Sequence, residues 1–254
     1  MPALEDLNLL EDAVREAGHI ARKFYGGDYK RWNKEGGSPV TEADLAVNKL
    51  LHDRLTSARP GYGWLSEETA DDPARLTRRE VFVIDPIDGT IAFLKNRPHF
   101  TICAAIVVDG RPCCGVVYNP ISDELFSARA GAGAHRNGAA IHVGSRDRLE
   151  ACAMLGDRTQ FLQAPWPPMH VQNRNSVAYR LVLVADGSAD ASVSLTAKRD
   201  WDLAAADVIL HEAGGLLTDT SGAALIYNRP VTKQASLIAA NPALHAKVVE
   251  LLRI

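Results

Sequence analysis

The sequence feature that most constrains the fold is the run from Val81 to Thr90, which reads V-F-V-I-D-P-I-D-G-T. Its four leading apolar residues predict a buried strand that ends at Asp85. We expect Pro86 to prevent the strand from continuing inside a sheet, because proline has no N–H to donate. A short helix is predicted to begin at Gly89-Thr90. Asp85 and Asp88 are therefore expected on a stiff turn just before a helix N-terminus.

Such a turn suits metal-assisted phosphate chemistry. Carboxylate oxygens bind hard cations, and the free N–H groups at a helix start bind anions such as phosphate. A purely structural interpretation is also open, in which Asp85 caps the helix and Asp88 is the acidic residue of its first turn. The short motif alone does not decide between the two, because such motifs also arise by chance.

Composition excludes several classes of function. The 254 residues are 46% hydrophobic and 23% charged, which is typical of a globular protein with one domain or two packed lobes. A net charge of −3 without a Lys/Arg run argues against nucleic acid as the main ligand. The acidic N-terminus does not resemble a secretory signal, and no apolar run is long enough to span a membrane. The cysteines show no C-x-x-C spacing and predict buried reduced thiols and a cytoplasmic location; they are Cys103, Cys113, Cys114 and Cys152.

The first half of the chain predicts two amphipathic helices and one sheet. The first helix covers residues 4–24 and is ended by Gly26-Gly27. The second begins at a capping box formed by Thr41 and Asp44, which by itself explains that aspartate structurally. Its expected core residues are Leu45, Val47, Leu50, Leu51 and Leu55. Strands are predicted over residues 29–32, 62–65, 101–108, 113–118, 124–128 and 140–143.

The second half predicts alternating strands and helices. The expected strands cover residues 152–155, 191–195, 216–218 and 237–240, and the expected helices cover residues 176–185, 203–213 and 243–252. Asp202 lies at a helix start, where it can serve as a cap or as a metal ligand. We therefore expect an N-terminal α+β lobe over residues 1–144 and a C-terminal α/β lobe over residues 145–254.

Together, these motifs resemble the inositol monophosphatase superfamily of Mg²⁺-dependent, typically lithium-sensitive phosphatases. The resemblance covers nearly the whole chain, and the D-P-I-D-G-T block followed by W-D-x-A-A is highly specific. The matching segments are residues 38–44 (S-P-V-T-E-A-D), Glu67-Glu68, residues 85–90, residues 115–118 (G-V-V-Y), residues 201–205 (W-D-L-A-A) and residues 212–215 (E-A-G-G).

The resemblance implies a layered αβαβα sandwich (α+β, α/β) with the active site between two lobes. One Mg²⁺ is expected on Glu67, Asp85 and the carbonyl group of Ile87, and a second on Asp85, Asp88 and Asp202. Glu67 is also expected to reach a third ion through water. Asp44 and Thr90 match the pair that orients the attacking water. The amides of Gly89 and Thr90 match the groups that bind the phosphate. Asp88 and Asp202 are also expected to face the substrate there. The implied reaction is direct hydrolysis of a small phosphate ester.

The substrate remains open between two alternatives. The L-S-E-E run at residues 65–68 and the F-L-K-N run at residues 93–96 are similar to the 3'(2'),5'-bisphosphate nucleotidase (CysQ-type) branch. That branch removes the 3'-phosphate of adenosine 3',5'-bisphosphate. The N-S-V-A-Y-R run at residues 175–180 is closer to the monophosphatase type, which favours inositol 1-phosphate or a sugar monophosphate.

Three cations bear on this choice. Arg180, Lys198 and Arg199 are candidate partners for a second phosphate, although solvated charges at element ends are the structural alternative. A further alternative is a regulatory or binding protein that retains the fold. The intact carboxylate set argues against lost catalysis, because close carboxylates repel one another unless a cation is present. A homodimer is expected from the resemblance alone.

Overall fold

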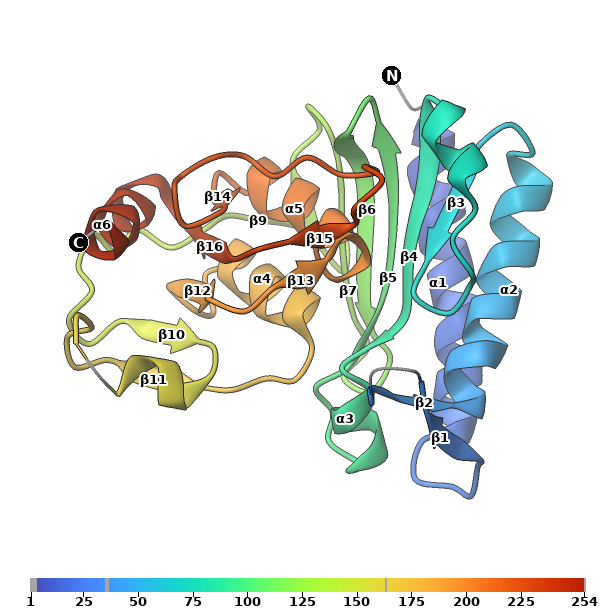
Figure 1. Cartoon of the computed structure of the whole chain (residues 1–254), viewed down its shortest axis with the longest axis horizontal. Coiled ribbons are helices and arrows are strands. Elements are labelled where there is room, and N and C mark those ends of the chain that lie inside the picture. Colours follow the sequence, from blue (N-terminus) through green and yellow to red (C-terminus); the bar gives the residue numbers. More distant parts are fainter. Residues whose placement is uncertain (1–3, 35–36, 163, 254) are drawn as a thin grey trace.

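The chain folds into five alternating layers of helices and sheets (Figure 1). Helices α1 (Leu4–Phe24) and α2 (Glu42–Ala58) cover one face of a seven-stranded sheet. Helices α4 (Val177–Ala185) and α5 (Asp200–Glu212) lie between that sheet and a five-stranded sheet. Helix α6 (Pro242–Leu252) covers the outer face of the second sheet. The predicted αβαβα sandwich is confirmed.

This computed structural model describes residues 4–34, 37–162 and 164–253. The first predicted helix is confirmed at both ends. The capping box of α2 is also confirmed, because the Thr41 hydroxyl accepts from the Asp44 amide and the Asp44 carboxylate accepts from the Thr41 amide. Leu45 was expected in the core but is 42% exposed, so that expectation was wrong. No helix in the described ranges combines the length and apolarity needed to cross a membrane.

The seven-stranded sheet follows chain order from β3 to β9. Strands β3 and β4 are parallel, and every other neighbouring pair is antiparallel. The strands are β3 (Gly63–Ser66), β4 (Glu80–Asp88), β5 (Thr101–Val108), β6 (Arg111–Asn119), β7 (Glu124–Arg129), β8 (Ala134–Arg136) and β9 (Ala139–Ile141). A 3-10 turn, η1 (Pro73–Thr77), links β3 to β4, and the short helix α3 (Thr90–Leu94) follows β4.

Strand β4 does not stop before Pro86, as the sequence predicted, but continues to Asp88. Its pairing with β3 ends at Ile84. Pro86 lies beyond the residues paired with β3, so its missing N–H removes no hydrogen bond from that ladder. On the β5 side the register shifts between Asp85 and Asp88. This irregularity is a β-bulge, a feature that re-aims side chains at the end of a strand.

The five-stranded sheet has the order β11-β10-β12-β16-β14. Strand β10 is parallel to both of its neighbours, whereas β16 is antiparallel to β12 and β14. The strands are β10 (Ala153–Leu155), β11 (His170–Gln172), β12 (Ala191–Ser194), β14 (Leu216–Thr218) and β16 (Leu237–Ala240). Two small ladders pair β1 (Arg31–Asn33) with β2 (Pro39–Thr41) and β13 (Lys198–Arg199) with β15 (Lys233–Gln234), and η2 (Arg158–Phe161) precedes β11.

The middle helical layer joins the two sheets into one body. Leu65 and Val83 of the first sheet and Leu155 of the second belong to one apolar cluster with α4 and α5. Gly115 on β6 permits this close packing, because a Cβ there would collide with the backbone carbonyl oxygen of Ala205 on α5. The division into lobes at residues 144 and 145 stays a prediction.

Candidate active site

Three carboxylates from distant parts of the sequence meet in one cleft. Oxygen atoms of Asp85, Asp88 and Asp202 all lie within 4.8 Å of one another. The bulged end of β4 provides the first two, and the first turn of α5 provides the third. Their cleft has a volume of about 400 Å³ and is also lined by Glu67, Ile87, Gly89 and Thr90. The structure therefore brings the predicted metal ligands together.

The Asp88 carboxylate is held by the N-terminus of α4. One oxygen accepts hydrogen bonds from the Ser176 hydroxyl at 2.7 Å and from the Ala178 amide at 2.7 Å. The other accepts from the Val177 amide at 3.2 Å. Ser176 is also the N-cap of α4, and its hydroxyl oxygen lies 2.9 Å from the Thr101 hydroxyl oxygen. Ser176 was predicted at a helix start, but its contact with the site was not predicted.

The other two carboxylates have fewer partners. One Asp202 oxygen accepts from the backbone N–H of Arg199 at 2.8 Å, which fixes Asp202 against the start of α5. One Asp85 oxygen accepts from the backbone N–H of Ile87 at 3.0 Å, within the turn itself. Because each carboxylate carries several lone pairs, these bonds leave oxygen positions free to bind a cation.

Burial and mutual repulsion disfavour ionisation of this cluster in the absence of a cation. Burial, followed by the charges of Glu67, Asp88 and Asp202, raises the pKa of Asp85 well above its usual range. Burial also raises the pKa of Asp88 to about 6 and that of Asp202 to about 8. A bound divalent cation would relieve this cost. Clustered carboxylate oxygens are the ligands that Mg²⁺ prefers, so the residues fit the metal that the resemblance implies.

Glu67 lines the cleft beside the three aspartates and takes part in an ion-pair network. The Lys34 ammonium lies 2.9 Å from a Glu67 oxygen and 2.6 Å from a Glu68 oxygen. Burial raises the pKa of Glu68 to about 7, although its bond to Lys34 opposes this shift. Lys34 was not among the predicted site residues. Its charge fixes the Glu67-Glu68 pair at the edge of the cleft.

Asp44 and Thr90 form the predicted pair next to the carboxylate cluster. The Thr90 hydroxyl oxygen lies 3.4 Å from an Asp44 oxygen and 3.2 Å from the Ile87 carbonyl oxygen. The second Asp44 oxygen accepts from the Thr41 amide at 2.8 Å and from the Thr41 hydroxyl at 2.5 Å. Burial raises the pKa of Asp44 to about 6. A carboxylate with this pKa is suited to exchange protons near neutral pH.

Gly89, between Asp88 and Thr90, is required by the local backbone. Its φ is +95°, a conformation that side-chain-bearing residues rarely adopt. A Cβ there would also lie 2.9 Å from the Ser176 amide nitrogen and 3.0 Å from the His99 carbonyl oxygen. The glycine therefore allows the turn at the end of β4 to approach the start of α4.

A second hollow of about 650 Å³ adjoins the cleft and shares Lys198, Ile91 and Asn175 with it. Arg174, Arg180 and Lys198 place three cationic side chains on its wall. Burial lowers the pKa of Arg180, and burial together with repulsion from Arg180 lowers the pKa of Lys198. The Arg180 Nε has no hydrogen-bond acceptor among the described residues. The wall therefore contains a desolvated guanidinium group with unused donor capacity.

Arg199, the third predicted phosphate partner, lies in another place. Its guanidinium lies 5.6 Å from the centroid of the Trp201 ring and donates to the Thr232 hydroxyl at 3.4 Å. It lines a hollow of about 440 Å³ that shares Glu67 with the cleft, and neither Arg180 nor Lys198 lines that hollow. Its side chain is thus not grouped with the other two cations.

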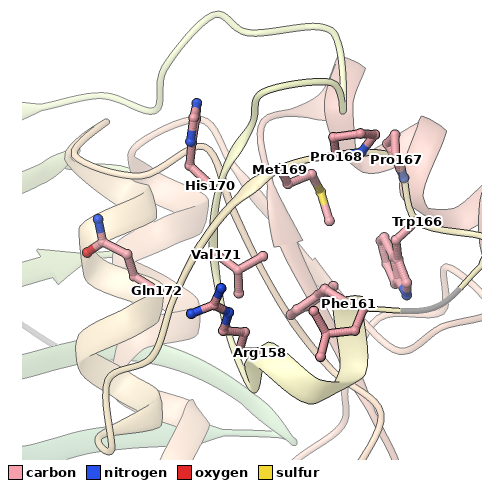
Figure 2. Close-up of a pocket in the computed structure, with 10 residues that line it drawn as sticks. Arg158, Phe161, Trp166, Pro167, Pro168, Met169, His170, Val171 and Gln172 are labelled. Atoms are coloured by element: carbon pink, nitrogen blue, oxygen red, sulfur yellow. The ribbon is translucent and has the colours of Figure 1, made fainter.

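A separate hollow of about 600 Å³ lies between η2 and the edge strand β11 (Figure 2). Phe161 and Trp166 pack edge-to-face there, with ring centroids 4.9 Å apart, beside Met169 and Val171. None of the cleft carboxylates lines this hollow. We therefore place the candidate chemistry in the aspartate cleft.

Comparison with known proteins agrees with this geometry. The chain is 32% identical to the 3'(2'),5'-bisphosphate nucleotidase CysQ of Aggregatibacter actinomycetemcomitans, over 90% of each chain. It is 34% identical to the Nus factor SuhB of Pasteurella multocida, over 85% of each chain. The solved IMPase structure from Thermotoga maritima superposes with a TM-score of 0.85 at 28% identity, covering 98% of this chain and 97% of the other. The model of the inositol monophosphatase family matches residues 4–254, and this chain is a member of that family.

Proposed function

We propose that this protein hydrolyses a small phosphate monoester by attack of a metal-activated water, and that its preferred substrate is adenosine 3',5'-bisphosphate, cleaved at the 3'-phosphate. The family is one of phosphatases, which supports the reaction class. The observation that carries the finer proposal is the cationic hollow beside the carboxylate cleft.

The proposed mechanism assigns a role to each part of the cleft. Glu67, Asp85, the Ile87 carbonyl, Asp88 and Asp202 would hold two or three Mg²⁺ ions. Bound there, Mg²⁺ would acidify the attacking water and neutralise charge on the phosphate oxygens. Thr90 would accept a hydrogen bond from the water and orient it, while Asp44 would receive the proton. The hydrogen bond from Thr41 keeps the Asp44 oxygens directed toward Thr90.

The charge of the adjoining hollow favours a substrate with a second phosphate. Lys198 lines both the cleft and the hollow, and the buried Arg180 lines the hollow together with Arg174. The carboxylate on the described wall, Asp157, already accepts from the amide and the hydroxyl of Thr159 at 3.0 and 2.9 Å. A second phosphate would relieve the repulsion between Arg180 and Lys198, whereas the neutral hydroxyl groups of inositol would not.

Two other functions need to be separated from this one. Inositol 1-phosphate or a sugar monophosphate is the alternative substrate, favoured by the N-S-V-A-Y-R run, whose Asn175 and Val177 line the cleft. A binding role is the second alternative, since one relative is named as a Nus factor. Phosphate release distinguishes either enzyme from a pure binding protein.

The decisive experiment measures phosphate release with Mg²⁺ on three substrates: adenosine 3',5'-bisphosphate, adenosine 3'-monophosphate and inositol 1-phosphate. The bisphosphate is expected to give the highest kcat/KM. Lys198→Gln is expected to lower kcat/KM for the bisphosphate by about 10- to 100-fold, because it removes a hydrogen bond between charged groups. It should affect adenosine 3'-monophosphate far less, because that substrate lacks the second phosphate.

Arg199→Gln is the matched control, since it removes a neighbouring cation that faces a different hollow. It should leave the preference between the two nucleotides unchanged. An equal loss on both nucleotides in Lys198→Gln, or a preference for inositol 1-phosphate, would contradict the nucleotide assignment. If none of the three substrates releases phosphate, the proposal that this protein hydrolyses them is contradicted.

A further inference from the structure

Strand β6 contains two adjacent cysteines whose side chains do not alternate as a regular strand requires. Successive residues of a strand point to opposite faces of the sheet. Cys114, Val116 and Tyr118 accordingly face the core under α1 and α2, whereas Val117 faces the other cluster. Cys113 should therefore face away from Cys114. It instead packs against the same core cluster as Cys114.

A β-bulge explains this exception. Ile106 on β5 pairs with Cys114, and the next residue, Val107, pairs with Pro112, so Cys113 is the extra residue. Its thiol donates to the Ile106 carbonyl oxygen at 3.0 Å. The proximity of the two thiols lowers the pKa of Cys113 and raises the pKa of Cys114. The bulge thus brings two neighbouring thiols to one face of the sheet.

The covalent geometry of adjacent cysteines favours a one-atom bridge over a disulfide. Neighbouring Cα atoms are about 3.8 Å apart across a trans peptide. A relaxed disulfide needs Cα atoms about 4.4–6.8 Å apart, so direct oxidation of this pair would strain the chain. Inserting one thiophilic atom between the sulfurs lengthens the bridge and removes this requirement. Both cysteines are free thiols in the structure.

We propose that Cys113 and Cys114 form a vicinal dithiol site that captures a trivalent arsenical. In the reaction with an arylarsine oxide, two S–H bonds and the arsenic–oxygen bonds break, and two arsenic–sulfur bonds form. The oxide oxygen leaves as one water that carries both thiol protons. Arsenic stays trivalent, so the reaction needs no oxidant or reductant.

The surroundings of the two thiols determine which arsenic–sulfur bond forms first. Cys113 is half-buried and Cys114 is fully buried, so the reagent meets Cys113 first. Cys113 is also the thiol whose pKa is lowered, which makes it the better first nucleophile. The pair lies next to the hairpin that joins β5 to β6. Asp85 and Asp88 pair with the opposite end of β5, so the dithiol is separate from the active site.

The test treats the native full-length protein with one equivalent of phenylarsine oxide and follows the product by intact-mass spectrometry. We expect one adduct, equal in mass to a phenylarsine group minus two hydrogens. Peptide mapping should place it on Cys113 and Cys114. A dithiol such as 2,3-dimercaptopropanol should remove the adduct, whereas excess glutathione should not, because two bonds hold the arsenic.

Cys113→Ser is expected to abolish the glutathione-resistant adduct, and its half-buried position makes it the variant least damaging to the fold. Cys152→Ala is the matched control, since it removes a buried thiol next to β10 of the other sheet and should keep the adduct. The proposal is overturned if the native protein forms no adduct, if glutathione removes it, or if Cys113→Ser retains it. The mapping on native protein gives an answer even if a variant fails to fold.

Discussion

Ser176→Ala should reveal how the start of α4 supports the proposed metal site. The substitution removes the bond from the Ser176 hydroxyl to Asp88 and the N-cap bond from the Tyr179 amide to the Ser176 oxygen, which measure 2.7 and 2.9 Å. Loss of the cap costs about 1 kcal/mol. Loss of a hydrogen bond to a charged group costs about 1.5–3 kcal/mol. The free energy of unfolding is therefore expected to fall by about 2.5–4 kcal/mol.

The same change should weaken metal binding, because Asp88 loses a partner that orients it. Removal of such a supporting hydrogen bond typically lowers metal affinity by about 10- to 100-fold. The assay is the Mg²⁺ concentration for half-maximal phosphate release, measured together with urea unfolding.

Asn241→Ala provides the control, because Asn241 caps α6 through the Leu244 amide at 3.0 Å and does not contact the site. It should lower stability and leave the Mg²⁺ requirement unchanged. If Ser176→Ala also leaves the Mg²⁺ requirement unchanged, the reasoning is refuted and Ser176 is only a helix cap.

Two further predictions concern the carboxylate cluster. Asp85→Asn should nearly abolish phosphate release and leave the circular dichroism spectrum unchanged; a near-normal rate would contradict the metal assignment. Without divalent cation, Tm should fall as the pH rises from about 6 to about 8, because native Asp202 and Glu68 hold protons that the unfolded chain has already released. Added Mg²⁺ should reverse this fall at pH 8, and a metal-free Tm that rises across the interval would show that the cluster ionises without cost.

The elements that the sequence predicted well are those with a strong local pattern. Strand β5 was predicted over its full length, because eight consecutive apolar or β-branched residues carry no competing helical period. Helix α1 combines a long apolar stripe with two glycines at its end. The strands β2, β8, β11, β13 and β15 were not predicted, since two or three residues rarely display a period; β14, with three residues, was predicted because all three are apolar or β-branched.

The site was predicted through its motifs but not through its contacts. The carboxylates at 85, 88 and 202 stand in specific sequence blocks, and the structure clusters them. The bond between Ser176 and Asp88 joins residues 88 positions apart, so no local pattern could indicate it. Arg180 and Arg199 look equivalent as charges in a sequence. Only packing shows that Arg180 faces the hollow beside the cleft and Arg199 does not.

The sequence presented helix capping and catalysis as competing explanations for the aspartates, but the structure allows both at once. Asp44 accepts from the Thr41 amide at the start of α2, Asp88 accepts from the first amides of α4, and Asp202 accepts from the Arg199 amide at the start of α5. Amides and the positive end of the helix dipole stabilise these carboxylates without occupying all of their lone pairs.

This arrangement separates Asp85 from the other carboxylates. Asp85 accepts from the Ile87 amide within its own turn and caps no helix. Changing Asp44, Asp88 or Asp202 should therefore cost both stability and activity. Changing Asp85 to asparagine should cost activity alone, because asparagine does not ionise and so avoids the cost that burial and the charges of Glu67, Asp88 and Asp202 impose on the Asp85 carboxylate. In metal-free protein the Asp85→Asn variant should be at least as stable as the native chain. A large loss of stability in urea unfolding would mean that Asp85 has a structural role that its hydrogen bonds do not reveal.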